Sequence, residues 1–187
     1  MEQRNPNEPV GGRPAGGVPV YDTTVIRPPL RAEDVKLRGE GMAPERLKKI
    51  KKALQTLHTL ETMAVTIYKF QLTGKCTELN RQLVTAMCNE MTHLQDFQVK
   101  LYEYGWKPSK FRWAYWIVGW VFGTFSRVMG VKQILKTGIW VESKAVDHYA
   151  ELLETVEWED EVRPIVEKNQ ADEGGHINRW RTLLEAL

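Results

Sequence analysis

The sequence predicts an all-α protein built around a four-helix bundle, and three observations support this fold class. Apolar residues recur at helical spacing along most of residues 44–187. The segments TGKC and WEDE interrupt this pattern where turns between helices are expected. Two Glu-x-x-His pairs and two single glutamates lie in four different helical segments, which is the arrangement of a two-metal site in the core of such a bundle.

The Glu-x-x-His pairs are Glu90 with His93 and Glu173 with His176, and the single glutamates are Glu61 and Glu142. A spacing of three residues places the carboxylate and the imidazole of each pair on one helix face, about one turn apart. Glu61 also falls inside the apolar stripe of its helix, where a charged residue is unexpected. The alternative is that all six are ordinary solvated residues on helix surfaces.

The heights of the glutamates along their helices support the metal site. Glu61 lies 12 residues before the break at Thr73, and Glu90 lies 13 residues after the start of the next helix. In antiparallel helices both would stand about 18–20 Å from their shared turn. Glu142 and Glu173 stand 14 and 13 residues from the ends of the second pair of helices. The four carboxylates can therefore reach one plane through the middle of the bundle.

Charge gives a further argument for metal. Four glutamates in a bundle core would be very costly to bury unless they were protonated or bound to metal. Two divalent cations would formally neutralise the four carboxylates, and two neutral imidazoles would complete the shell. The predicted metal ligands are therefore Glu61, Glu90, His93, Glu142, Glu173 and His176.

Composition limits the class of protein. The chain has 187 residues, of which 42% are hydrophobic and 27% charged, and this length suits one domain with one core. The formal net charge is only +2, so we expect no nucleic-acid partner. Cys76 and Cys88 lack CxxC spacing, and the start of the chain is unlike a secretory or transit peptide. We therefore expect reduced thiols and a cytoplasmic protein, either free or peripheral on the inner membrane.

The chain divides by composition at about residue 43. Residues 1–43 are rich in Pro and Gly and show no helical period, which predicts a flexible or extended N-terminal arm. Within this arm we expect residues 1–17 to be disordered, and residues 18–30 have enough apolar side chains to lie extended on a surface. Residues 44–187 form the predicted helical domain.

The first pair of predicted helices has clear limits. The first helix runs from Pro44, a favoured first-turn residue, to Thr73. Its apolar stripe consists of Leu54, Leu57, Val65, Tyr68 and Leu72. Thr77 is a suitable N-cap for the second helix, which closes near Gly105.

The stretch of residues 111–130, FRWAYWIVGWVFGTFSRVMG, is apolar almost all round. As a helix it would span about 30 Å, so we expect it to be the crossover of a ferritin-like connection. Its uninterrupted apolar part is short for a transmembrane helix. Together with nearby Lys107, Lys110 and Arg112 it suits peripheral membrane contact or the mouth of an apolar pocket. Burial in the core or in a homo-oligomer interface is the alternative.

The last two predicted helices enclose the acidic turn WEDE. One covers about residues 131–156 and carries Glu142, His148 and Tyr149. The other begins near Asp160, has Pro164 in its first turns and carries the second Glu-x-x-His pair.

Four segments, in this order, resemble the demethoxyubiquinone hydroxylase family: HTLETMAVTIY, NEMTH, RVMGVKQILKTGIWVESKAVDHY and DEGGH. Members of this family are ferritin-like di-iron monooxygenases of ubiquinone biosynthesis. The resemblance covers roughly residues 55–180, and it implies that the six predicted ligands hold two iron ions. One departure concerns Gly174 and Gly175, where the family usually has bulky residues, since each costs about 1 kcal/mol in helix propensity.

The resemblance also implies catalytic residues beside the metals. His58, His148 and Tyr149 stand where that family has a histidine, a histidine and a tyrosine. We expect them next to the ligands or in a quinone site, and a core histidine without a catalytic role is the alternative for His58 and His148. The helix with Trp113, Trp116 and Trp120 is the expected wall of an apolar channel for the lipid tail.

The implied function is O2-dependent hydroxylation of a demethoxyubiquinol-like quinone lipid, with NADH or another electron donor. One alternative is a ferritin-like iron or peroxide-handling protein that uses the same ligands without a quinone. Another is a non-enzymatic helical interaction module that uses the N-terminal arm and the Trp-rich face. Manganese in place of iron is also compatible with the ligands.

Overall fold

The computed structural model describes residues 30–187 and contains five α-helices and one short 3-10 helix in that range, with no strand. The all-α fold class is therefore confirmed. The described residues before Leu37, which include the 3-10 helix η2 (Ala32–Asp34), form a separate unit from Leu37–Leu187. The predictions for residues 1–29 lie outside the described range, and the domain limits at 1–43 and 44–187 stay a prediction.

The helices of the second unit are α1 (Pro44–Gln71), α2 (Glu78–Glu103), α3 (Arg112–Val128), α4 (Val131–Thr155) and α5 (Arg163–Glu185). All five lie within a few residues of their predicted limits. Thr77 caps α2 as predicted, because its hydroxyl accepts the backbone N–H of Asn80 at 3.2 Å. The start of α5 comes later than predicted because the backbone N–H of Val162 donates to the carbonyl of Glu159 in a turn.

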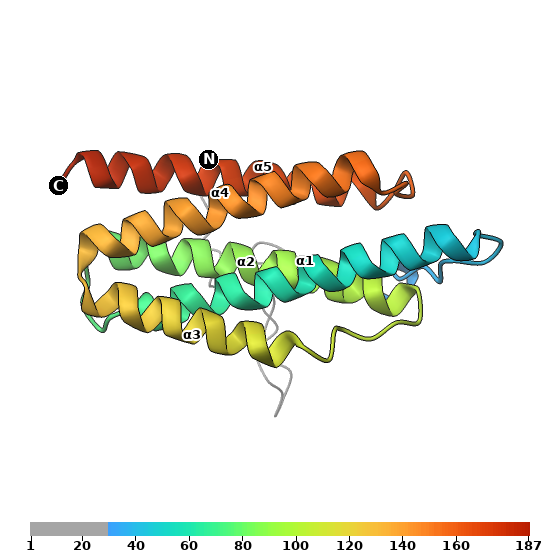
Figure 1. The fold of residues 1–187 in the computed structure, drawn as a ribbon, viewed down its shortest axis with the longest axis horizontal. Helices are drawn as coiled ribbons and strands as arrows, with labels where there is room; N and C mark the ends of the chain where they lie inside the picture. Colours follow the sequence, from blue (N-terminus) through green and yellow to red (C-terminus); the bar gives the residue numbers. More distant parts are fainter. Residues whose placement is uncertain (1–29) are drawn as a thin grey trace, which may run out of the picture. The chain divides into compact units, whose positions relative to one another are not determined.

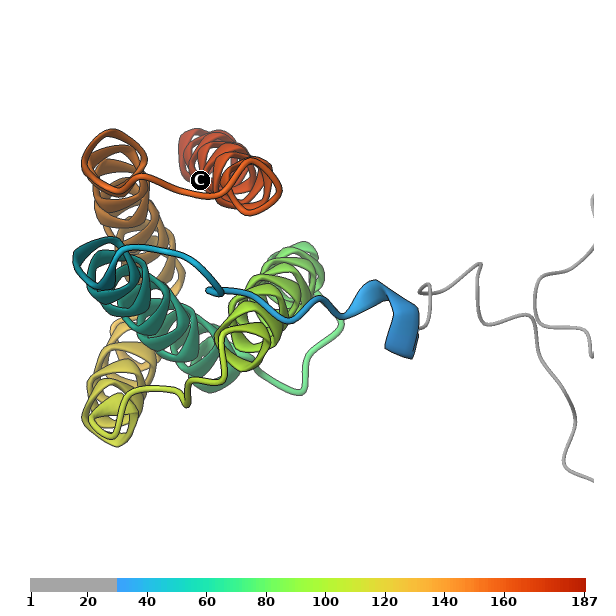
Figure 2. The same ribbon diagram turned by 90° about the vertical axis from the view of Figure 1, so that its right-hand side faces the viewer.

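The chain runs up and down the bundle with one long crossover. Helices α1 and α2 form one antiparallel pair, and α4 and α5 form the other (Figure 1). Between the pairs, α3 carries the chain back along the bundle, so that α4 starts at the end opposite to the end of α2 (Figure 1). Seen along the helices, α3 lies outside the other four, beside α1 (Figure 2). This is the predicted ferritin-like arrangement with its crossover helix.

Two glycines determine how closely α3 approaches α1. A Cβ atom on Gly119 would lie 2.7 Å from the carbonyl oxygen of Met63, and one on Gly123 would lie 2.6 Å from that of Ile67. A side chain at either position would force the helices apart, so this approach requires glycine. The turn into α4 also requires one, because Gly130 has a φ angle of 91°.

The buried apolar residues form two clusters along the bundle. One cluster contains residues from the first half of α1, the end of α2 and the start of α5, such as Leu54, Phe97 and Val166. The other contains residues from the opposite halves of these helices, such as Leu83 and Trp180. The predicted ligands lie between the two clusters in the sequence of every helix, at the common height that the helix lengths predicted.

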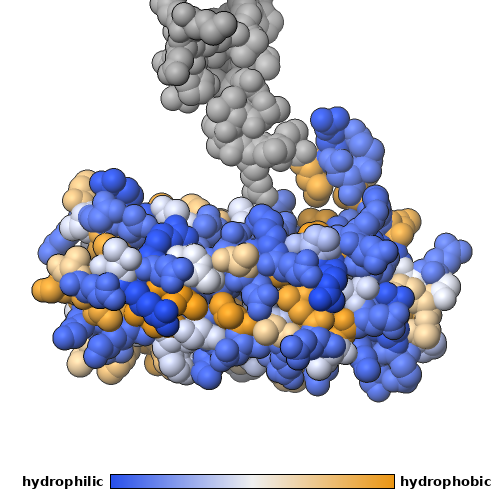
Figure 3. Space-filling model, turned by 90° about the horizontal axis from the view of Figure 1, so that it is seen from above, coloured by the Kyte–Doolittle hydropathy of each residue, from blue (hydrophilic) through white to orange (hydrophobic). Residues whose placement is uncertain are grey.

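The apolar surface is unevenly distributed. The face seen in Figure 3 is mainly hydrophilic, with apolar residues in a band along its length. Helix α3 differs, because it exposes a run of large apolar side chains, including Trp113 at 62% and Phe125 at 58%. None of the helices in the described range combines the length and apolar character that a membrane span requires.

Candidate metal centre

The structure brings the six predicted ligands together in the middle of the bundle, each at most 2% exposed. They come from α1, α2, α4 and α5. They form two overlapping groups, in each of which one ligand atom per residue lies within 4.8 Å of the others. The first group is Glu61, Glu90, His93 and Glu173, and the second is Glu90, Glu142, Glu173 and His176. Two glutamates therefore belong to both groups, as carboxylates that bridge neighbouring ions would.

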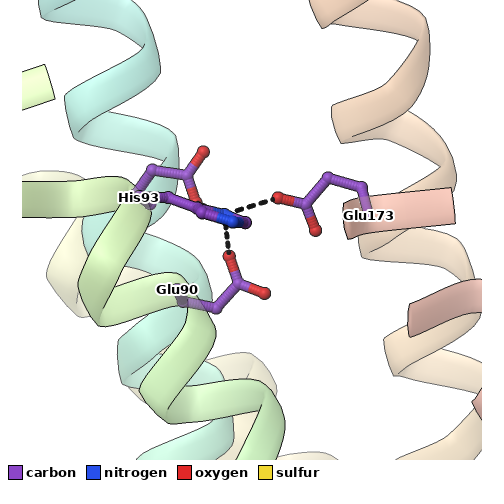
Figure 4. Close-up of side chains that lie close together, drawn as sticks. Glu90, His93 and Glu173 are labelled. Atoms are coloured by element: carbon purple, nitrogen blue, oxygen red, sulfur yellow. Dashed lines mark ion pairs between the residues drawn. The ribbon is translucent and has the colours of Figure 1, made fainter. Parts of the chain in front are cut away.

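In the first group, His93 turns its Nδ1 atom toward the carboxylates. This nitrogen lies 3.1 Å from Glu173 Oε1, 3.4 Å from Glu90 Oε2 and 3.9 Å from Glu61 Oε2. Figure 4 shows the imidazole between Glu90, one turn away on α2, and Glu173, which reaches it from the facing helix α5. Nδ1 is thus the nitrogen that a metal in this group would bind.

The second group repeats this geometry around His176. Its Nδ1 atom lies 2.9 Å from Glu90 Oε1, 3.3 Å from Glu173 Oε2 and 3.4 Å from Glu142 Oε1. Glu90 and Glu173 therefore direct one carboxylate oxygen toward each histidine. The two halves of the cluster therefore have equivalent contacts, each with one histidine, one glutamate of its own and the two shared glutamates.

The donor atoms at the centre fit a pair of metal ions. Both carboxylate oxygens of Glu90 and of Glu173, and the Nδ1 atoms of His93 and His176, are buried without a hydrogen bond of good geometry to any described residue. Burying unpaired polar atoms is costly, so their convergence on one small volume needs an explanation. Carboxylate oxygen and imidazole nitrogen are ligands that iron and manganese accept, and two such ions would satisfy all of these atoms.

Without metal, the cluster holds protons. Burial lowers the pKa of His93, but the Glu173 and Glu90 carboxylates outweigh it and raise this pKa to about 11. Burial also lowers the pKa of His176, but the three glutamates around it raise it to about 12. Burial and the nearby carboxylates raise the pKa of Glu61 and the pKa of Glu142 well above the usual range of a glutamate. Metal binding must therefore displace protons.

Two tyrosines hold the outer glutamates crosswise. Tyr149 on α4 donates its hydroxyl to Glu61 Oε1 on α1 at 2.5 Å. In return, Tyr68 on α1 donates its hydroxyl to Glu142 on α4. The structure thus places Tyr149 against a predicted ligand. Tyr68 was expected only as part of an apolar stripe, although it follows Glu61 by seven residues just as Tyr149 follows Glu142.

The outer nitrogens of the two histidines meet different partners. His93 Nε2 lies 3.2 Å from Asp172 Oδ2, whereas His176 Nε2 lies 3.3 Å from Asn89 Nδ2. Each partner comes from the opposite helix. Neither partner was predicted. Each directly precedes the glutamate of a Glu-x-x-His pair, so the motif repeated in the two helices includes this preceding residue as well.

The remaining two histidines take no part in either group. His58 is buried and donates from Nε2 to Gln98 Oε1 at 3.0 Å, and burial lowers its pKa. His148 is half-buried, with Nδ1 3.5 Å from Glu151 Oε2. His148 also lines the cavity beside the cluster, whereas His58 does not. The catalytic roles predicted for both stay predictions.

A cavity of about 290 Å³ adjoins the cluster, and Glu61, Glu142 and Glu173 form part of its wall. Most of the remaining wall is apolar and comes from α1, α3 and α4. Tyr115 is the residue that α3 contributes, and Trp140 is contributed by α4. The cavity therefore offers a largely apolar space in direct contact with the predicted ligands.

The tryptophans expected to form this wall lie elsewhere. Trp113, Trp116 and Trp120 do not line the cavity and are between 44% and 62% exposed. The reason is the rotation of α3, whose glycine stripe faces α1 and leaves the tryptophans on the outer surface. Helix α3 does contribute to the wall of the cavity, but through Tyr115 and not through the tryptophans, and the lipid channel itself stays a prediction.

Residues 48–182, more than half of the chain, match the family model described as "Ubiquinone biosynthesis protein COQ7". The matched range contains all six clustered residues. A comparison with curated proteins finds no match.

Proposed function

The chain belongs to the family of ubiquinone biosynthesis protein COQ7, and from this membership we propose that it is a di-iron monooxygenase that hydroxylates the ring of a demethoxyubiquinol-like lipid. The observation that carries the proposal is the pair of overlapping glutamate and histidine groups beside an apolar cavity. The cavity favours this reaction over handling of iron or peroxide, because those small polar substrates need no apolar space.

Iron ions held by the two groups would supply the redox chemistry that lets O2 react with the ring. The reaction would take up two electrons from an external donor such as NADH and two protons. One oxygen atom would enter a ring C–H bond, and the other would leave as water. One ion would be held by Glu61 and His93, the other by Glu142 and His176, and both by Glu90 and Glu173. The two tyrosine hydroxyls fix the orientation of the outer carboxylates.

The cavity would receive the quinol ring and keep water away from it. Its volume of about 290 Å³ is near the lower end for ligand sites, so it suits a ring whose lipid tail continues outside. His148 lines it with Nε2 buried and without a hydrogen-bond partner in the described chain. This nitrogen is therefore suited to exchange a proton with a hydroxyl of the ring.

The exposed apolar face of α3 is the proposed contact with the membrane that contains the lipid. Trp113, Trp116 and Phe125 stand out from this helix, while Tyr115 on the same helix lines the cavity. One helix thus joins an apolar surface to the space where the ring would bind. A homo-oligomer that buries this face is the alternative, and a vesicle flotation assay beside a measurement of molar mass separates the two.

Filling the cavity tests the proposed function. Ala145→Phe places a ring in the cavity at a position that is not one of the six predicted ligands, so we expect quinol hydroxylation to be lost while iron content stays at the wild-type level. Ala171→Phe, at an exposed position of α5, is the matched control and should keep both. Wild-type turnover by Ala145→Phe would contradict the proposal. A wild-type protein that oxidises iron or consumes peroxide but never hydroxylates the quinol would support the ferritin-like alternative.

A further inference from the structure

The two halves of the cluster differ at one pair of equivalent positions. Asp172 and Asn89 each directly precede the glutamate of a Glu-x-x-His pair. Each contacts the outer nitrogen of the histidine on the other helix, Asp172 at 3.2 Å from His93 and Asn89 at 3.3 Å from His176. The same structural position therefore carries a carboxylate in one half and a neutral amide in the other.

This difference acts on the nitrogen that faces the centre. When Nδ1 of a neutral imidazole binds a metal, the ring proton is on Nε2, which then donates a hydrogen bond outward. A carboxylate accepts this bond with charge assistance, which fixes the ring and makes Nδ1 a stronger donor to the metal. An amide gives a weaker bond. Asn89 also presents its Nδ2 atom to His176, so the amide must rotate to offer its oxygen.

Asp172 is well placed to keep its charge for this role. Lys168, one turn earlier on α5, lies 2.9 Å from the same Oδ2 atom that faces His93. The Asp172 side chain is 38% exposed, whereas the imidazole of His93 is fully buried. The carboxylate therefore stays solvated at the edge of the bundle while one of its oxygens reaches the buried ring.

We propose that the two metal positions are unequal, and that Asp172 is the positioning residue that makes the position of Glu61 and His93 bind its ion more tightly than the position of Glu142 and His176. The inference rests on the ligand assignment of the proposed function. Outer partners of metal-bound histidines typically change metal affinity by about 10-fold to 100-fold, which is the expected difference between the two positions.

Single-site variants measure each position by itself, which avoids the repulsion between two bound cations. Glu142→Ala leaves the position that contains His93, and Glu61→Ala leaves the position that contains His176. Anaerobic titration with cobalt(II), followed by its visible absorption, gives a Kd for each. We expect the Glu142→Ala protein to bind cobalt about tenfold more tightly than the Glu61→Ala protein.

Exchanging the outer residues provides the decisive comparison. Adding Asp172→Asn should weaken cobalt binding about tenfold in the Glu142→Ala protein only, and adding Asn89→Asp should strengthen it in the Glu61→Ala protein only. Asp160→Asn, the same change at an exposed position in the turn before α5, is the control and should leave cobalt binding unchanged in both single-site proteins. Circular dichroism checks that each variant is folded, and both exchanges preserve side-chain shape.

Two results would overturn this inference and leave the proposed function intact. One is equal affinity in the two single-site variants, and the other is a Kd that does not respond to Asp172→Asn. If the wild-type protein binds no cobalt or iron at all, the proposed function fails and the inference fails with it.

Discussion

Tyr149 on α4 donates its hydroxyl to Glu61 on α1 at 2.5 Å, and seven residues after Glu61 the hydroxyl of Tyr68 donates to Glu142 on α4. The two hydrogen bonds cross the bundle in opposite directions between the same pair of helices. Trp180 completes one of them by donating its Nε1–H to the Tyr68 oxygen at 3.1 Å. Helix α4, which supplies Glu142, thus holds the Glu61 carboxylate, and α1, which supplies Glu61, holds the Glu142 carboxylate.

Replacing either tyrosine by phenylalanine removes one hydrogen bond and keeps the ring. We expect Tyr149→Phe to weaken metal binding in the half that contains Glu61, and Tyr68→Phe to weaken it in the other half, each by about tenfold. The reason is that without the hydrogen bond the carboxylate has no fixed orientation, so metal binding must also restrict its motion. Cobalt titration measures both effects. Tyr102→Phe, at a 53% exposed tyrosine, is the control, and equal affinities in all three variants would show that the hydrogen bonds have no part in metal binding.

Metal binding should become stronger as the pH rises. The pKa of His93 is raised to about 11 and that of His176 to about 12, so both imidazoles carry an extra proton near neutral pH in the absence of metal. A metal needs the Nδ1 lone pair, so each histidine releases about one proton on binding, and the raised pKa of Glu61 and of Glu142 adds to this release. Each affinity should therefore rise at least about tenfold per pH unit. Calorimetry in buffers with different ionisation enthalpies counts these protons. An affinity that is constant between pH 6.5 and 8 would contradict the protonated state of the metal-free site.

The contact between α3 and α1 should be sensitive to a single methyl group. Gly123→Ala places a Cβ atom 2.6 Å from the Ile67 carbonyl oxygen, so we expect it to reduce the free energy of unfolding by about 1–3 kcal/mol. Gly174→Ala is the matched control, because, apart from its chain neighbours and the adjacent backbone of α5, no heavy atom of the described structure lies within 4 Å of its Cβ position. It should stabilise α5 by about 1 kcal/mol. Urea unfolding measures both, and a neutral Gly123→Ala would show that the helices can separate freely.

The height of the centre could be predicted from the sequence because helix geometry is constant. A rise of about 1.5 Å per residue places Glu61 and Glu90 at one level once the turn between their helices is located. The turn was recognisable because Thr77 is a strong N-cap and Gly74 interrupts the helical pattern. The two apolar clusters on either side of this level follow from the same periodicity.

The partners around the ligands could not be predicted in the same way. Asn89, Asp172 and Tyr68 act on residues of other helices, and such contacts depend on the rotation of each helix about its axis. An amphipathic stripe fixes that rotation only to within about 100°. Helix α3 has no single apolar stripe, so its sequence did not reveal that Tyr115 faces the cavity while Trp113 faces outward.

The iron content of the protein tests the central claim most directly. We expect wild-type protein, loaded anaerobically with iron(II) and separated from free metal, to hold about two iron ions per chain by elemental analysis, and Glu142→Ala to hold about one and to lose hydroxylation. Glu185→Ala, at an exposed position of α5, should keep two. Wild-type protein without stoichiometric iron, or Glu142→Ala with two irons and full activity, would contradict the claim that these six side chains hold a pair of cations.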